Sequence, residues 1–247
     1  MSLIRQFAIF MNNLGYDAYV YPAKLIKLDK TFTPYIFTHD EISKIIEVSD
    51  NLKRCKCSPN YHLIYPVLIR LLYGCGLRIS EALSLKVADV NLQEGILTIT
   101  KSKFNKSRLV PVSVSLSKAL SDYAANMNFS SKDDGYFFPA LDKGRYNRTP
   151  VYLKFRHIVK EAGIIHPRRP GLHDLRHTFA VHALEKMVRQ GRDIYCSLPI
   201  LCAYLGHTGI ESSQKYLRLT EQSFSSITSL LETLYKNIFP EVKSNEK

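Results

Sequence analysis

Apolar residues recur at intervals of three and four over most of the chain, the spacing that predicts amphipathic α-helices. A capping box opens one such segment at Thr38–Glu41, and Gly74 and Gly76 end the next one. Thr149 followed by Pro150 marks another helix start. The segments with this spacing are about 3–14, 42–46, 61–73, 82–85, 115–126, 151 onward, 172–184, 198–205, 212–217 and 221–237.

The pattern changes at residues 95–112, GILTITKSKFNKSRLVPV, where apolar and polar residues alternate. The alternation runs through Ile96 and Thr98, turns near Phe104, and resumes from Leu109. Alternation on both sides of a polar turn predicts a β-hairpin, here with a lysine-rich tip. The chain is therefore predicted to be mainly α with one small antiparallel β-sheet, an α+β fold.

Composition places the chain among globular proteins of the cell interior. It has 247 residues, of which 45% are hydrophobic and 23% charged. No apolar run approaches the roughly 18 residues of a membrane span, and no signal-peptide cleavage pattern follows the N-terminus. The five cysteines are an odd number with no paired C-x-x-C, so reduced thiols and a cytoplasmic location are expected.

The charge is more informative than the composition. Thirty-four lysine and arginine residues stand against 22 acidic ones, a net charge of +12 that favours polyanions, either nucleic acid or an anionic membrane surface. Charge alone does not separate this interpretation from a merely solvated surface. The basic residues that we take as candidates for DNA contact fall in clusters: Lys101, Lys106, Arg108, Arg145, Arg148, Arg168 and Arg169.

The stretch GLHDLRHTFAVHAL, residues 171–184, allows two kinds of site. His173 and His177 have the i, i+4 spacing of a zinc hydrolase helix, but Asp174 stands where such a helix needs a glutamate, and no third ligand follows at a recognised spacing. The alternative is a phosphate site, because His173 and Arg176 share a helix face and arginine offers a planar fork to two phosphate oxygens. Taken alone, the two histidines are best explained as hydrogen-bonded helix-terminal or core residues.

Three further motifs decide between these interpretations. GLRISE places Arg78 after a glycine-broken helix end with Glu81 three residues on, the hairpin carries Lys103 at its tip, and LGHTGIESSQKY holds His207 and Tyr216. With HDLRHTFA these motifs resemble, in the same order, those of the tyrosine recombinases, or phage-type integrases. The resemblance covers about residues 35–237 and implies the catalytic-domain fold of that family.

The resemblance also implies roles for individual residues. Tyr216 matches the nucleophile that forms a 3′-phosphotyrosyl bond, and Lys103 matches the hairpin lysine that acts as general acid. Glu81 would support Arg78. The hairpin reads Ser-Lys-Phe where the family has Gly-Lys-Gly, which makes Lys103 the weakest match. The residues that match the pocket for the scissile phosphate are Arg78, Arg176, His173 and His207.

The chemistry of strand transfer fits these residue types. A phenol with a pKa near 10 needs a nearby base at neutral pH, and the imidazole of His173 is the candidate for that base. Guanidinium groups can supply the charge stabilisation that a metal ion supplies elsewhere. Covalent capture of the DNA conserves the energy of the broken bond. The reaction is therefore expected to need no cofactor, neither metal nor ATP.

The resemblance predicts the domain organisation and the partners. Residues 1–32 would be a remnant, such as the last helix, of an N-terminal core-binding domain plus a linker; 33–240 the catalytic domain; and 241–247 a disordered tail. The partner is double-stranded DNA, bound weakly and with little sequence discrimination because the clamp is incomplete. The chain is expected to be a monomer in solution and a tetramer on synapsed DNA, with accessory DNA-bending proteins and no membrane.

Two functions of other classes are kept as alternatives. One is a DNA-binding regulator that has the fold without the chemistry, although every expected catalytic residue type is present. The other is the zinc hydrolase built on the HDLRH helix. A DNA-relaxing topoisomerase with the same catalytic pocket is the near neighbour of the preferred function.

Overall fold

The computed structural model describes residues 2–22, 33–56, 58–100, 107–130, 133–206 and the single positions 216, 219 and 220. The chain divides into two compact units, residues 1–34 and 35–247. The first unit holds helix α1, Ser2–Asn13, as its apolar spacing predicts, and Arg5 Nε donates to the Tyr21 carbonyl over 2.9 Å. Within the described ranges, no helix is both long and apolar enough to cross a membrane.

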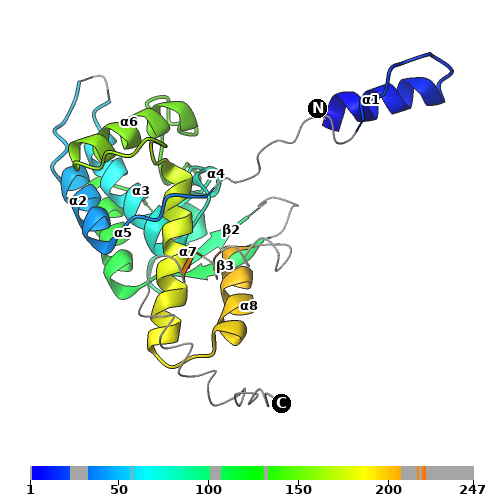
Figure 1. Cartoon of the computed structure of the whole chain (residues 1–247). Helices are drawn as coiled ribbons and strands as arrows, with labels where there is room; N and C mark the ends of the chain where they lie inside the picture. The colour runs from blue at the N-terminus through cyan, green and yellow to red at the C-terminus, as the bar shows by residue number, and fades with distance from the viewer. Residues whose placement is uncertain are drawn as a thin grey trace, which may run out of the picture. The chain divides into compact units, whose positions relative to one another are not determined.

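The second unit is mainly helical with a small sheet, so the predicted fold class is confirmed (Figure 1). Helix α3 packs against α2, α5 and α7, and α7 also packs against α8. In Figure 1 the sheet lies on the opposite side of this unit from α2 and α6. The elements in order are α2 (His39–Asp50), α3 (Tyr61–Cys75), α4 (Ile79–Ala82), η1 (Val87–Asp89), β1 (Val90–Asn91), β2 (Ile96–Ile99), β3 (Arg108–Pro111), α5 (Val114–Asn126), α6 (Arg148–Glu161), α7 (Leu172–Arg189) and α8 (Ile194–Leu205).

The sheet is antiparallel in the order β1-β2-β3. Leu97 pairs with Val110 and Ile99 with Arg108, which confirms the hairpin between β2 and β3. Leu97, Ile99 and Val110 point into the core, because side chains of a strand alternate between the two faces. The predicted hairpin tip, residues 101–106, lies outside the described residues, as do the predicted helix at 221–237 and tail at 241–247.

Gly76 makes possible both the end of α3 and the close approach of α7, two features that position residues of the site described below. Helix α3 is buried along most of its length and ends at Cys75, where Gly76 takes a left-handed conformation with φ +58°. A Cβ at Gly76 would lie only 2.4 Å from Phe179 Cδ1, so the close approach of α7 also requires glycine.

Helix α8 begins at Ile194, four residues before the predicted start, because the Asp193 side chain caps it by accepting from Cys196 N.

Candidate active site

Arg78 and Glu81 form the first part of the site, at the start of α4. Arg78 is the residue before the helix, and Glu81 accepts its backbone N–H over 3.0 Å and its Nη1 over 2.7 Å. A glutamate at the third helical position reaches back in this way, so the i, i+3 spacing itself brings the pair together. The Glu81 side chain is buried, whereas the Arg78 side chain is partly exposed.

Arg176 is held by the ends of two helices. It is 2% exposed, and it donates to the Gly76 carbonyl over 2.6 Å and to the Leu205 carbonyl over 2.7 Å. These carbonyls lie at the C-terminal ends of α3 and α8, where carbonyl groups lack helical partners and the helix dipole is negative. Burial and the neighbouring Arg78 lower the pKa of Arg176 to about 10, so the group stays charged at neutral pH.

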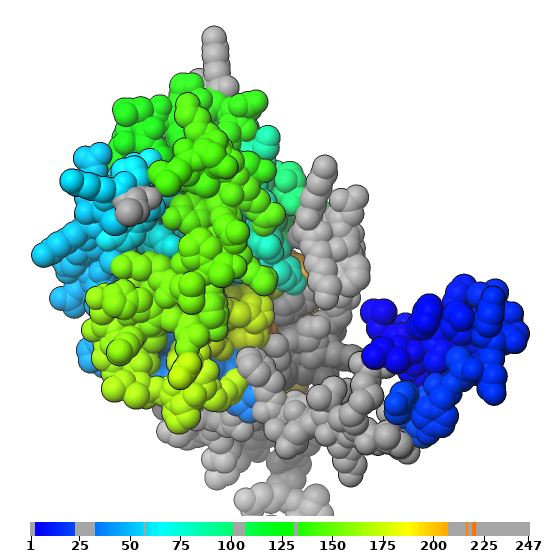
Figure 2. Space-filling model, turned by 90° about the horizontal axis from the view of Figure 1, so that it is seen from above, coloured from blue at the N-terminus to red at the C-terminus, as the bar shows by residue number. Residues whose placement is uncertain are grey.

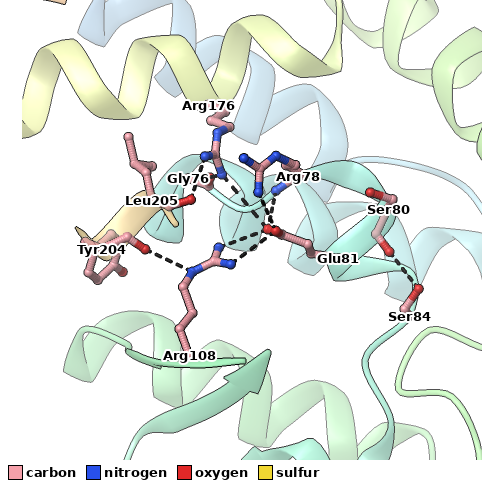
Figure 3. A network of polar contacts seen from close by, with 9 residues as sticks. All are labelled: Gly76, Arg78, Ser80, Glu81, Ser84, Arg108, Arg176, Tyr204 and Leu205. Carbon is pink, nitrogen blue, oxygen red and sulfur yellow. Dashed lines mark hydrogen bonds and ion pairs between the residues drawn. The ribbon is translucent and has the colours of Figure 1, made fainter. Parts of the chain in front are cut away.

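Arg108 completes a cluster of three guanidinium groups around one carboxylate (Figure 3). Its Nη1 and Nη2 donate to the two oxygens of Glu81 over 3.1 and 2.9 Å, and its Nε donates to the Tyr204 carbonyl over 3.0 Å. Arg176 Nη1 lies 3.9 Å from Glu81. With three positive charges and one negative charge, the cluster has a formal charge of +2 and favours an added anion.

Tyr216 lies close to this cluster. Its side chain is 1% exposed, and its hydroxyl is 3.0 Å from Nδ1 of the buried His177. Burial raises the pKa of the Tyr216 phenol, while Arg176 and Arg78 act in the opposite direction. The site therefore brings a phenol, an imidazole and guanidinium groups together.

His177 is the residue whose place the sequence does not reveal, since its motif offers it only as a zinc ligand or a core histidine. His173 packs its ring edge-on against His177, with 4.6 Å between centroids. The i, i+4 spacing of the two histidines is the available signal, because it places both on one helix face. No three His, Cys, Asp or Glu side chains of the described ranges converge as a metal site.

The other predicted residues lie on the surface around this cluster or outside the described residues, and Arg145 Nη2 donates to the Ser80 carbonyl of α4 over 3.1 Å. Lys103, His207, Lys101 and Lys106 lie outside the described residues. Arg108, predicted to contact DNA, instead has its guanidinium engaged by Glu81 and Tyr204 inside the protein. The segment 133–170 covers much of the face drawn in Figure 2. It carries the four remaining basic candidates, all exposed: Arg145, Arg148, Arg168 and Arg169.

The carboxyl of Glu81 gives the site a measurable pH dependence. Burial alone would raise its pKa, but the hydrogen bonds from Arg108 and Arg78 outweigh burial and lower the pKa from 4.5 to about 2. Because the folded-state pKa is the lower one, the stabilisation is complete above pH 4.5 and is lost as the pH falls toward 2.

We expect the free energy of unfolding of wild type to exceed that of Glu81→Gln by about 3 kcal/mol at pH 7. The difference should shrink as the pH falls below 4.5, the usual pKa of the group. Urea unfolding at a series of pH values measures it. Glu47→Gln, which changes an exposed carboxylate of α2, is the matched control and should have little effect. A difference that stays constant with pH would contradict the assignment.

A family model described as the phage integrase family matches residues 36–223. The tyrosine recombinase XerA of Pyrococcus horikoshii is 29% identical over 227 residues, 89% of this chain and 70% of that protein. The XerA of Pyrococcus furiosus is 32% identical over 216 residues, 84% of this chain and 66% of that protein. Among solved structures, the XerH site-specific recombinase bound to difH substrate, a pre-cleavage complex, is similar with a TM-score of 0.61 and 26% identity. That similarity covers 83% of this chain and 56% of the XerH chain.

Proposed function

This chain belongs to the phage integrase family, and we propose that it is a site-specific DNA recombinase that cuts and rejoins strands through a 3′-phosphotyrosyl bond on Tyr216. The observation that carries the proposal is the buried Tyr216 hydroxyl beside His177 and next to a guanidinium cluster of formal charge +2. Cleavage of a phosphodiester needs both a nucleophile and positive charge at the non-bridging oxygens.

The reaction we propose is a transesterification in which bonds balance. The Tyr216 oxygen forms a bond to the scissile phosphorus and loses its proton, while the bond from phosphorus to the 5′ oxygen breaks. The 5′ oxygen takes a proton from the general acid, for which Lys103 remains the candidate. Arg78, partly exposed beside Glu81, binds a non-bridging oxygen through its solvent-facing side, and Arg176 adds charge from behind. Reversal of the step rejoins a strand, with no cofactor needed to restore the bond energy.

His177 is proposed as the acceptor of the Tyr216 proton, in place of His173. Its Nδ1 lies within hydrogen-bond reach of the phenol, the geometry that a general base needs. His173, packed edge-on against His177, would then orient that ring and keep its predicted contact with the phosphate.

His177→Gln is expected to slow covalent capture of DNA by about a hundredfold at pH 7, the low end for loss of a general base. The rate of the variant should keep rising with pH up to 10, because the buried phenol, whose pKa is raised, ionises without a base only at high pH. Single-turnover measurements of the covalent product between pH 6 and 10 test this. His157→Gln, an exposed histidine on α6, serves as control. An unchanged rate and pH profile would remove His177 from the reaction.

The proposed function is tested with a pool of nicked duplexes of random sequence, because the natural site is unknown. The full chain is incubated with the pool in EDTA and quenched in denaturant, and covalent protein–DNA products are isolated and sequenced. Covalent products joined to Tyr216 at a 3′-phosphate support the proposal, and any sequence enriched among them identifies a preferred site. Duplex binding without any covalent product would overturn it in favour of the DNA-binding regulator.

We extend the proposal to domains and assembly. Residues 33–240 act as the catalytic domain on duplex DNA in the cell interior, and residues 1–32 belong to an N-terminal DNA-clamping part. The exposed basic candidates on the segment 133–170 support duplex binding by charge. The chain is monomeric when free and tetrameric on synapsed DNA, with accessory bending proteins as further partners.

A further inference from the structure

Arg108 makes contacts that a surface arginine does not need. All three of its guanidinium nitrogens are engaged, two with Glu81 and one with the Tyr204 carbonyl. Its side chain is 12% exposed. Among protein side chains, guanidinium alone offers two parallel N–H donors to a carboxylate together with a further Nε–H for a carbonyl.

The end of helix α8 packs directly on this guanidinium. Gly206 follows α8 with φ +67°, and a Cβ built on it would lie 3.0 Å from Arg108 Nη1 and 3.2 Å from its Cζ. The backbone at Gly206 is therefore in close contact with Arg108, and any larger residue would displace one of them. Arg108 thus lies between the α4 carboxylate and the end of α8.

Through these contacts Arg108 connects both phosphate-site arginines to the hairpin. Glu81 accepts from both Arg108 and Arg78. At the end of α8, Arg108 donates to the Tyr204 carbonyl and Arg176 to the carbonyl of the next residue, Leu205. Arg108 itself begins β3 and pairs with Ile99, the last residue of β2. The hairpin tip that carries Lys103 follows Ile99 and precedes Arg108 in the sequence.

From this placement we infer that Arg108 is a positioning residue: it sets Arg78 through Glu81 and holds the hairpin base in register with the ends of α4 and α8. The inference rests on the proposed function for its effect on rate. It replaces the prediction that Arg108 contacts DNA. A DNA contact would require the guanidinium to release Glu81, leaving a buried carboxylate with fewer donors.

The test compares Arg108→Gln and Arg108→Lys with two controls, on the duplex recovered from the random pool. Arg70→Gln is the matched control, since Arg70 also grips a carboxylate, Asp50, with two N–H groups over 2.6 Å, but on α3 and outside the site. Arg148→Gln is the comparison for loss of an exposed DNA-contact candidate. Two quantities are measured: the salt dependence of equilibrium DNA binding, and the rate of covalent capture at saturating DNA.

Both Arg108 variants are expected to lose about ten- to a hundredfold in the saturated rate, by analogy with outer groups that orient metal ligands. The slope of log K against log salt should stay at its wild-type value in both, whereas Arg148→Gln should change it by about 0.9. Arg70→Gln should leave the saturated rate unchanged. An unchanged rate in Arg108→Gln, together with a slope change near that expected for Arg148→Gln, would overturn the inference and restore a DNA contact.

A second readout does not depend on activity. A ¹³C NMR titration of the Glu81 carboxyl should show its pKa higher in Arg108→Gln than in wild type and unmoved in Arg70→Gln. If wild type captures no DNA but this pKa rises, the proposed function fails while the Arg108–Glu81 contact holds. If wild type captures DNA and neither the pKa nor the rate responds to Arg108→Gln, the inference about Arg108 fails alone.

Discussion

Tyr216→Phe is expected to abolish covalent capture of DNA, a loss of at least about 10⁴-fold, because it removes the attacking oxygen itself. The substitution is a sharp test since Tyr216 packs in the apolar cluster of α7 and α8, and phenylalanine keeps the ring that fills this space. It removes the 3.0 Å hydrogen bond between the phenol and His177. Each hydrogen bond lost with the hydroxyl should cost about 1 kcal/mol of stability, so the variant is expected to fold.

The measurement is a denaturing gel of the protein with the duplex recovered from the random pool, alongside equilibrium binding to the same duplex. Tyr195→Phe, at an exposed tyrosine of α8, is the control and should give the covalent product at the wild-type rate. Tyr216→Phe should bind the duplex as wild type does and form no product. Product formation by Tyr216→Phe would assign the nucleophile to another residue.

Arg176→Lys is expected to lower the rate of covalent capture by about 10²- to 10³-fold, the size found when one donor to a developing negative charge is removed. Lysine keeps the positive charge, so the change in rate measures the contribution of the planar guanidinium geometry. A single ammonium group on a flexible stem cannot reproduce the paired contacts with the Gly76 and Leu205 carbonyls, and it no longer fixes the charge beside Tyr216.

The same substitution weakens the fold, because a buried carbonyl left without a donor costs about 1–3 kcal/mol. Rates are therefore compared well below the unfolding midpoint of the variant, determined by circular dichroism. Arg189→Lys, in the last turn of α7 with its ion pair to Glu185, is the control on the same helix. A folded Arg176→Lys with the wild-type rate would mean that Arg176 only joins the two helix ends.

Much of the fold follows from local patterns. The capping box at Thr38, the glycine after α3 and the alternation on both sides of the hairpin each involve residues within a few positions of one another. The predicted start of α8 is too late, because the helix already begins at the buried Ile194, directly after the Asp193 cap. Pro199 inside that helix also weakens the signal.

Part of the site is also local in origin. Arg78 and Glu81 are an i, i+3 pair, so their contact can be expected from spacing. Arg176 and Tyr216 belong to two of the motifs, but the motifs alone do not show what surrounds them. The contacts of His177 with Tyr216 and of Arg108 with Glu81 could not be predicted, because they span 39 and 27 positions of sequence. The sequence therefore suggests other roles for His177 and Arg108.

The sequence by itself determined most helices of the described ranges, the two strands of the hairpin, the basic charge and the four motifs, since spacing, caps and residue type act over short distances along the chain. Only the tertiary structure decided which imidazole meets the phenol, and that Arg108 turns inward to Glu81 and the end of α8. Those contacts depend on how α4, α7, α8 and β3 pack, and packing fixes side-chain directions that no local pattern carries.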